Sequence, residues 1–376
     1  LGFKPIVLTT TAFSYRRIDE KLTIPPQVEL YRTPSLDVSR HLSIKGKYFD
    51  FLATPDRYSS WFPGARLKAN YLLRKHQPRL IFSSFPFISN HMLALSIAKK
   101  SGIPLIAEYR DPAPFHYNGG KYNKQFINVD RDTIQYSKRV IFATGKMQNL
   151  YESLFPSQKG KFSVIENGFN EAVFNSKSQS KNDSSLQGQI TILHSGAIYD
   201  EGRNPLPLIK ALHQLISTDK LLESDQIKII FRGSNPFKAL SDYIDKYDLH
   251  ENVHFKEPIS YEESIEEMLD SDILFLLQGE LFKYQIPGKA YEYLAANKAI
   301  LALSPQNSAT NELMQPIDGV YTANDDNIAE IKQALLNAIS ECRSNVITRD
   351  LSLYSRHARS MQLADVFEQE LGLSEK

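Results

Sequence analysis

The sequence has few of the residues that build disulfides and metal sites. Its 376 residues include a single cysteine, Cys342. One cysteine excludes an internal disulfide and any zinc site made from several cysteines. The nine histidines are scattered without metal-ligand spacing. We therefore expect no catalytic metal and no cofactor.

Long apolar runs and the common nucleotide motifs are also missing. No run approaches the ~20 apolar residues that a membrane-spanning helix needs. The first residues lack the charged and apolar segments of a signal peptide, so we expect a cytoplasmic protein. Because the chain opens on Leu1, we expect it to be a trimmed form. The P-loop, the dinucleotide G-x-G-x-x-G, H-E-x-x-H and G-x-S-x-G are all absent from the sequence.

The net charge of +1 is small, but the two signs are unevenly distributed. Residues 1–170 hold 25 Lys and Arg against 12 Asp and Glu, which gives +13; the remainder holds 19 against 31, which gives −12. This asymmetry favours an anionic partner for the first half. Nucleic acid, an anionic membrane surface and a phosphorylated acceptor fit it, and so does mutual attraction between two domains.

Short apolar runs alternate with helical patterns along the chain, and 376 residues exceed one comfortable core. Strands are predicted at 5–8, 80–82, 103–107, 140–143, 164–165, 190–193, 227–231, 273–277 and 300–303. Helices are predicted at 66–79, 89–100, 205–217, 260–269 and 351–371. A polar, Ser-rich segment at 175–189 is typical of a linker. The pattern predicts two α/β halves with parallel, doubly wound sheets that bind ligands at the carboxyl ends of strands.

The segment 285–297 (QIPGKAYEYLAAN) is the most informative part of the chain. Pro287 suits the start of a helix and Asn297 tolerates a left-handed cap. Lys289 and Glu292 are three residues apart and share a face of the first turn. A lysine at a helix N-terminus can hold a diphosphate, and a carboxylate one turn on can accept hydrogen bonds from a ribose diol. The alternative is an ion pair between the two side chains.

Glycines and cations recur where three strands of the second half end. These are Gly196 with Arg203, Gly233 with Ser234, and Lys289 with Glu292. Glycines let the backbone approach a ligand, and cations neutralise its phosphates. Together they predict a nucleotide diphosphate ligand.

These motifs, in this order, resemble the retaining glycosyltransferases of family 4, which have the GT-B fold of two Rossmann-like domains facing across a cleft. The matching C-terminal segments are 194–196, 202–205, 231–234, 271–273 and 287–295. The matching N-terminal segments are 55–56, 61–63, 83–86, 102–104, 110–112 and 165–169. The resemblance implies an acceptor-binding domain at 1–172, a donor-binding domain at 190–350 and a final helix, within 351–376, that crosses back to the first domain.

The resemblance also implies a function: transfer of a sugar, with retention and without a metal, from a nucleotide-diphosphate sugar, most commonly UDP- or GDP-linked. Arg203 and Lys289 would hold the diphosphate, and Glu292 the ribose. The remaining donor-site residues would be Gly196, Gly233, Ser234, Ser260, Gly288, Glu280 and Tyr284. Ser84, Pro86 and His116 are expected on the acceptor side.

The sequence departs from the family at several positions. Tyr284 stands where many members have a first glutamate, although Glu280 is near. Arg110-Asp111 replaces a His-Asp pair, and we assign both residues to the reacting face, with an ion pair at a turn as the alternative. These departures leave a non-catalytic nucleotide-sugar-binding subunit as a second hypothesis. A nucleotide-sugar 2-epimerase is a third, although we find no array of acid/base residues for it.

The acceptor is expected to be a lipid-linked molecule or a saccharide, in cell-surface polysaccharide or glycolipid synthesis, with no nucleic acid partner. Residues 66–79 form a basic helix with Leu67, Tyr71 and Leu72 as its apolar side. With Lys45, Lys47, Lys99 and Lys100 it could attract anionic lipid at the inner face of the plasma membrane, at about 1 kcal/mol per cation. A solvated helix that covers the sheet is the alternative.

Overall fold

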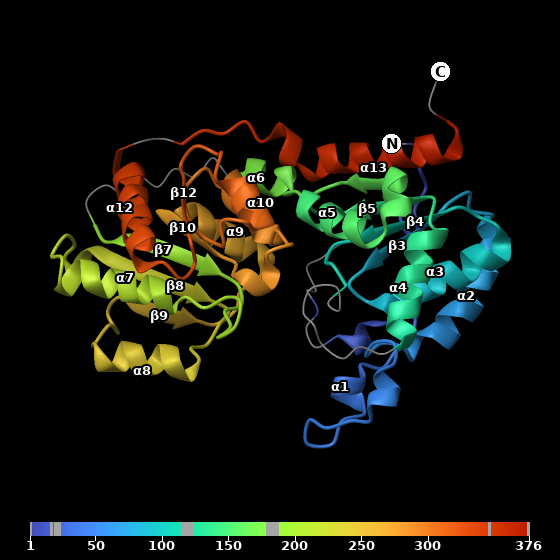
Figure 1. Cartoon of the computed structure of the whole chain (residues 1–376), viewed down its shortest axis with the longest axis horizontal. Helices are drawn as coiled ribbons and strands as arrows, with labels where there is room; N and C mark the ends of the chain where they lie inside the picture. The colour runs from blue at the N-terminus through green and yellow to red at the C-terminus, as the bar shows by residue number, and fades with distance from the viewer. Residues whose placement is uncertain are drawn as a thin grey trace. The chain divides into compact units, whose positions relative to one another are not determined.

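The computed structural model describes residues 2–15, 18, 24–113, 124–177, 188–344 and 347–373. The chain divides into two compact units (Figure 1). Unit 1 is Leu1–Ile165 with Ser360–Lys376, and unit 2 is Glu166–Arg359. Most of the predicted linker at 175–189 lies outside the described residues. Within the described ranges, no helix combines the length and apolarity needed to span a membrane.

Unit 1 contains two groups of parallel strands. β1 (Ile6–Thr10) pairs with β2 (Glu29–Thr33), and a separate sheet has the order β3-β4-β5-β6. The latter strands are β3 (Ile81–Phe85), β4 (Leu105–Tyr109), β5 (Arg139–Phe142) and β6 (Phe162–Val164). The sequence predicted all of these except β2, and it predicted one sheet rather than two groups.

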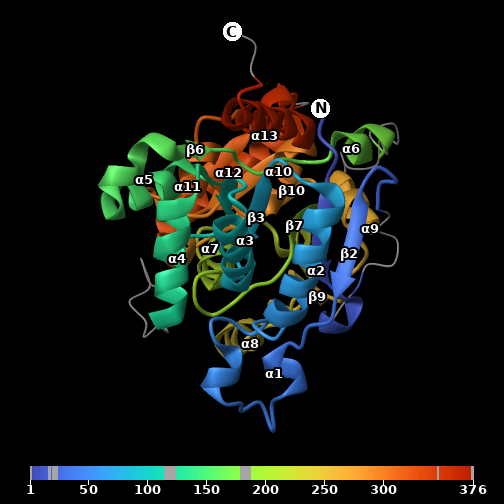
Figure 2. The same ribbon diagram turned by 90° about the vertical axis from the view of Figure 1, so that its right-hand side faces the viewer.

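The helices of unit 1 are α1 (Val38–His41), α2 (Trp61–His76), α3 (Ile88–Ser101), α4 (Lys124–Tyr136) and α5 (Gly145–Leu154), with the 3₁₀ turns η1 (Ala12–Ser14), η2 (Asp50–Ala53) and η4 (Pro156–Lys161). α3 lies between α2 and α4 (Figure 2). It ends at Gly102, whose φ of 73° is left-handed, as its helix-stopping role predicts.

The predicted apolar side of the basic helix is wrong in one residue. Leu67 is 75% exposed and Tyr71 46% exposed, but Leu72 is buried at 6%. The helix begins at Trp61, which packs with Ala65, Ala69 and Leu93 in the interior of the unit. Residues five apart, such as Leu67 and Leu72, point in different directions on a helix of 3.6 residues per turn. Leu72 therefore faces the core while Leu67 faces solvent.

Unit 2 contains a parallel sheet with the strand order β12-β11-β10-β7-β8-β9. The strands are β7 (Ile190–Ser195), β8 (Ile227–Arg232), β9 (Val253–Lys256), β10 (Ile273–Leu277), β11 (Ala299–Leu303) and β12 (Val320–Ala323). This is the doubly wound order, in which the first strand lies beside the fourth at the centre. The chain therefore reverses its direction of winding between β7 and β10.

Both faces of this sheet are buried, which explains its continuous apolar strands. Alternate residues of β10 enter different cores: Ile273, Phe275 and Leu277 enter one, and Leu274 and Leu276 the other. The first core includes α7 (Leu206–Ser217) and α12 (Ile328–Ser344), and the second includes α9 (Tyr261–Asp270), α10 (Gly288–Ala295) and α11 (Ala309–Met314). The remaining elements are α6 (Glu171–Lys177), α8 (Lys238–Lys246), η5 (Ser224–Gln226), η6 (Glu280–Phe282) and η7 (Ser352–Tyr354).

The last helix, α13 (Arg356–Leu371), begins in unit 2 and continues in unit 1. Within unit 1, the Phe367 ring lies 5.4 Å from that of Phe3, and Glu370 pairs with Arg139 at 2.7 Å. At the other boundary, Phe169 packs in the second core of unit 2, although the sequence assigned residues 1–172 to the first domain. The predicted domain limits thus stay a prediction, and the structure divides the chain seven residues earlier, after Ile165.

Candidate functional site

The carboxyl ends of β7 and β10 form the switch point of the unit 2 sheet. From β7 the chain proceeds to α7 on one face, and from β10 to α10 on the other. Such divergent connections leave a crevice where ligands bind in doubly wound sheets. The α10 end is suited to an anion because its N-cap, Pro287, provides no side-chain acceptor for the first N–H groups. By contrast, α9 and α11 are capped by Ser260 and Ser308.

Lys289, in the first turn of α10, turns toward the end of β7. Its Nζ lies 3.0 Å from His194 Nε2 and donates to the Ser195 carbonyl at 3.2 Å. His194 is fully buried, and its Nδ1 is 2.9 Å from the Phe275 carbonyl. A carbonyl can only accept, so Nδ1 carries the proton and Nε2 accepts from Lys289. The histidine thus holds the lysine at the switch point.

Burial and crowding of positive charge change the protonation of this pair. Burial, and then the nearby Arg203, lower the pKa of Lys289 to about 7, while Glu292 acts in the opposite direction. Burial and the Lys289 charge hold the pKa of His194 well below its usual range. The Lys289 and Arg203 charges therefore repel each other, while the half-buried Glu292 carboxylate attracts Lys289. A bound dianion would reduce that repulsion.

Arg203 reaches the same region from the loop after β7. Its Nε donates to Gln278 Oε1 at 2.9 Å, and its guanidinium lies 4.8 Å from the Phe282 ring centroid. Gln278 directly follows β10 and is fully buried, and its Nε2 has no hydrogen-bond partner. Gln278 was not predicted from the sequence. The signal was a polar residue immediately after the apolar run 273–277.

Glu292 and Lys289 have different hydrogen-bond partners. Its Oε1 accepts from the Tyr261 hydroxyl of α9 at 3.0 Å. Burial raises the pKa of Glu292, although the Tyr261 hydrogen bond and the charges of Arg356 and Lys289 favour the ionised form. The alternative of an ion pair between Lys289 and Glu292 is therefore not what the structure shows. Tyr261 was also missed, because its pairing with α10 depends on how the two helices pack.

The glycine positions allow this close packing. Gly196 has a φ of 127°, and a Cβ there would lie 3.1 Å from Lys289 Nζ. Its carbonyl accepts from Ser234 Oγ at 2.8 Å, and the same Oγ accepts from the Ile198 N–H at 3.0 Å. Gly233 also has a positive φ, of 78°, and lies against Pro258. Ser234 therefore fixes the loop after β7, a structural role beside the predicted one.

The other predicted donor-site residues are placed as follows. Ser260 and Glu263 form the predicted capping box at the start of α9, so the Ser260 side chain is engaged there. Gly288 is the exposed first residue of α10. Glu280, in η6, has an exposed side chain that pairs with Lys283. Tyr284 is half-buried, with Lys283 Nζ 5.6 Å from its ring centroid.

On unit 1, Arg110 and Asp111 directly follow β4, the first exposed and the second half-buried. The preceding Tyr109 is fully buried. The following loop is held where the Tyr151 hydroxyl accepts from the Ala113 N–H at 3.0 Å. His116 lies outside the described residues. The reacting-face assignment of Arg110 and Asp111 stays a prediction.

The other acceptor-side residues, Ser84 and Pro86, lie at the end of β3. Ser84 is half-buried and Pro86 is exposed. Ser84 Oγ donates to the Phe85 carbonyl at 3.3 Å. The N-terminus of α3, which follows them, already holds an anion: Asp56 Oδ2 accepts from the Ser89 N–H at 2.7 Å. This helix end is thus filled by the chain's own carboxylate.

Comparison with known proteins agrees with the motifs. Residues 27–173 match the family model described as Glycosyltransferase Family 4, which confirms the resemblance for the N-terminal half. No curated protein matches the sequence.

Solved structures extend the comparison to the whole chain. Sucrose-phosphate synthase from Thermosynechococcus elongatus is similar with a TM-score of 0.70 at 13% identity, over 99% of this chain and 90% of that one. A UDP-forming trehalose-phosphate synthase from Burkholderia xenovorans has a TM-score of 0.62 at 10% identity, over 97% and 98%. HepE of Anabaena, in complex with UDP, has a TM-score of 0.58 at 14% identity, over 81% of this chain and 82% of that one. These structures confirm the predicted GT-B fold, and the family-model match covers residues 27–173 of the chain.

Proposed function

We propose that the protein is a retaining glycosyltransferase that moves a sugar from a nucleotide-diphosphate sugar to an acceptor. The observation that supports this most directly is the convergence of Lys289, Arg203 and Glu292 at the switch point of unit 2. Residues 86 positions apart in the sequence supply two cations beside an uncapped helix N-terminus. Such a site fits a diphosphate, and the carboxylate beside it fits a ribose diol.

The chemistry follows from the charges. As the bond between the sugar and the diphosphate breaks, negative charge develops on the leaving oxygen. In this proposal Lys289 and Arg203 stabilise that charge from fixed positions, and stabilisation of this preorganised kind is usually the largest single contribution to catalysis. We propose that these two cations make a metal ion unnecessary. Retention at the sugar carbon is proposed from the resemblance to family 4.

UDP is the first nucleotide to test, because it is the ligand named for HepE and the product named for the trehalose-phosphate synthase. GDP is the second. We propose a lipid-linked or saccharide acceptor on unit 1, in cell-surface polysaccharide or glycolipid synthesis at the cytoplasmic face of the membrane. The positive charge of residues 1–170 supports an anionic partner there.

Thermal denaturation with UDP, GDP, CMP, ADP and their sugars tests the donor site. A nucleotide present at 100 times its Kd should stabilise the protein by about 2.7 kcal/mol. The stabilisation should be lost in Lys289→Met and weakened in Glu292→Ala. If neither variant loses the stabilisation, the proposed donor site is contradicted. If no nucleotide shifts the melting temperature, the proposed function is contradicted.

Product formation separates the remaining hypotheses. With radiolabelled donor and a mixture of lipid-linked and saccharide acceptors, a transferase forms a labelled product that Glu292→Ala forms much more slowly. Nucleotide binding without transfer would instead support the non-catalytic subunit. Recovery of the donor sugar epimerised at C2 would support the 2-epimerase.

A further inference from the structure

A cluster of large apolar side chains is exposed on one short segment of unit 1, between α1 and η2. Ile44 is 80% exposed, Phe49 and Phe51 are each 71% exposed, and Leu42 and Tyr48 are each 40% exposed. Every residue from 44 to 51 is exposed. Isolated exposed apolar residues are common, but this many within ten residues mark an interaction site. We name residues 42–51 the apolar tip.

The tip has a defined backbone. Ile44 and Lys47 exchange backbone hydrogen bonds, N–H to carbonyl, at 2.8 and 3.0 Å. The two residues between them, Lys45 and Gly46, have φ angles of 50° and 77°. Two positive φ angles in a two-residue connection define a type I′ hairpin turn. Lys45 is the non-glycine residue of this turn, and a positive φ is uncommon for a lysine.

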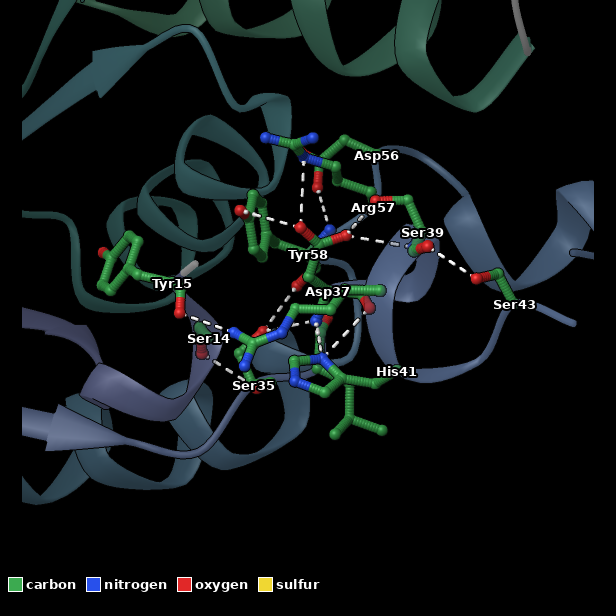
Figure 3. Close-up of polar contacts among 12 residues, drawn as sticks. Ser14, Tyr15, Ser35, Asp37, Ser39, His41, Ser43, Asp56, Arg57 and Tyr58 are labelled. Carbon is green, nitrogen blue, oxygen red and sulfur yellow. Dashed lines mark hydrogen bonds and ion pairs between the residues drawn. The ribbon is translucent and has the colours of Figure 1, made fainter. Parts of the chain in front are cut away.

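A polar platform holds the base of the tip (Figure 3). Asp37, which is 4% exposed, accepts from the Ser39 N–H at 3.0 Å and from the Tyr58 hydroxyl at 3.3 Å. Its other neighbour is Arg57, at 3.8 Å. Burial opposes ionisation, but the Ser39 hydrogen bonds and the Arg57 charge lower the pKa of Asp37. Residues on both sides of the tip are thus tied together.

The platform fixes where the tip lies on unit 1. Asp37 follows β2 by four residues, and Asp56 caps the N-terminus of α3, which follows β3. The segment between them therefore leaves and rejoins the unit at the carboxyl ends of strands, where ligands bind in such sheets. In both views the blue loop below α1 projects beyond the rest of unit 1 (Figures 1 and 2).

We propose that the apolar tip docks the protein on an anionic lipid bilayer, with Ile44, Phe49 and Phe51 among the acyl chains and Lys45 and Lys47 at the headgroups. The tip contains two lysines against one acidic residue, Asp50, and residues 1–170 carry a net charge of +13. Membrane association of this kind scales with buried apolar area and with attraction to anionic lipid.

A bilayer fits the tip better than a protein partner does. A stable protein interface buries about 800 Å² on each side, from roughly 20 residues or more. The tip offers ten residues, and its Ile44, Phe49 and Phe51 side chains are each more than 70% exposed. A projecting apolar group needs no complementary pocket in a fluid phase.

The tip deepens the membrane-associated part of the proposed function. It would bring the carboxyl edge of unit 1, with Ser84 and Arg110, to the level of lipid headgroups. An acceptor anchored in the same bilayer would then be met at that edge. The docking itself does not depend on which sugar is transferred.

The test is co-sedimentation with vesicles of phosphatidylcholine, with and without phosphatidylglycerol, at low and high salt. We expect salt-sensitive binding to the anionic vesicles. Phe49→Ser/Phe51→Ser should reduce it at least about tenfold, since each lost phenyl group removes a large apolar area from burial. Lys45→Glu/Lys47→Glu should reduce binding to the anionic vesicles and weaken its salt dependence.

Matched controls come from equally exposed residues elsewhere. Leu221→Ser and Leu353→Ser, at 60% and 69% exposure in unit 2, should bind as the wild type does. Leu67→Ser tests the basic helix α2 as the rival surface. A Phe49→Trp variant adds a direct readout: its emission should shift to the blue with anionic vesicles, whereas the native Trp61 is buried and should not respond.

Three results would overturn the proposal. They are absence of vesicle binding by the wild type, unchanged binding by the tip variants, and loss of binding in Leu67→Ser alone. A tip-dependent dimer on light scattering, without vesicle binding, would assign the tip to a second copy and overturn it as well. The tip variants should keep the melting temperature and the UDP-induced shift of the wild type. A protein that binds vesicles but no nucleotide would leave the docking intact and contradict the proposed function.

Discussion

Lys289 is a cation held in a position where its own charge is unfavourable. Burial and Arg203 lower its pKa to about 7, and the side chain is held by a neutral histidine and a carbonyl rather than by a carboxylate. Such an arrangement stabilises a protein poorly. It suits a negatively charged ligand, because that ligand provides the anionic partner for Lys289 that the histidine and the carbonyl do not provide.

This arrangement predicts proton uptake when UDP binds. Bound diphosphate should raise the pKa of Lys289 above 7, so the bound state holds more protons than the free state at higher pH. Affinity should therefore be greatest below pH 7 and fall as pH rises through the range above 7, by at most about tenfold per pH unit. Titration calorimetry at pH 8 in buffers of different ionisation enthalpy should detect the proton.

Lys289→Met provides the control, because methionine keeps most of the apolar stem and has no titrating group. It should bind UDP weakly, with the proton uptake above pH 7 removed. Equal proton uptake by the variant would assign the proton to another group and contradict the mechanism.

The sequence identifies candidate site residues where the chemistry depends on short spacing. Lys289 and Glu292 were chosen from their three-residue spacing, and Arg203 from its position in the loop after a strand; their roles stay predictions. Their partners His194, Gln278 and Tyr261 could not be assigned, because the contacts join elements about 31 to 95 residues apart. Such pairings depend on strand order and on helix packing, neither of which local sequence specifies.

At the level of helices and strands, the sequence was most reliable where a local rule applies. The capping box at Ser260, the left-handed cap at Asn297 and the buried strand β10 were all predicted and are all present. β2 was missed because Glu29–Thr33 is short and polar, with one of its five residues buried. The segment shows neither the continuous apolar run of a strand covered on both faces nor the alternation of a strand covered on one face.

The segments that join the two units meet inside unit 2 at a position where only glycine fits. Phe169 bridges to Ser355, and a Cβ at Gly168 would lie 2.6 Å from the Tyr354 carbonyl oxygen. Because the neighbour is backbone, it cannot rotate away. We predict that Gly168→Ala lowers the free energy of unfolding by about 1–3 kcal/mol, the usual cost of overpacking.

Gly160→Ala is the matched control, since a Cβ at Gly160 meets nothing within 4 Å. Chemical denaturation should show a lower midpoint for Gly168→Ala and little change for Gly160→Ala. A Gly168→Ala protein as stable as the wild type would mean that the two segments can separate slightly at no cost.

Over the whole molecule, the proposed donor residues and the proposed docking residues belong to different units. Lys289, Arg203 and Glu292 lie in unit 2, and the apolar tip lies in unit 1. Each unit also has its own buried clusters: β10 and its neighbours in unit 2, and Tyr109, Phe142 and Tyr151 in unit 1. The units therefore have the means to be stable separately, and a ligand of one should act first on that one.

This division predicts a selective response to UDP. The only tryptophan, Trp61, is buried in unit 1, so its fluorescence reports the unfolding of that unit. Circular dichroism reports both units, because both contain helices. At 100 times its Kd, UDP should stabilise unit 2 by about 2.7 kcal/mol, while the Trp61 transition moves less. Equal shifts by both probes would show that the two units, which share the helix α13, unfold as one.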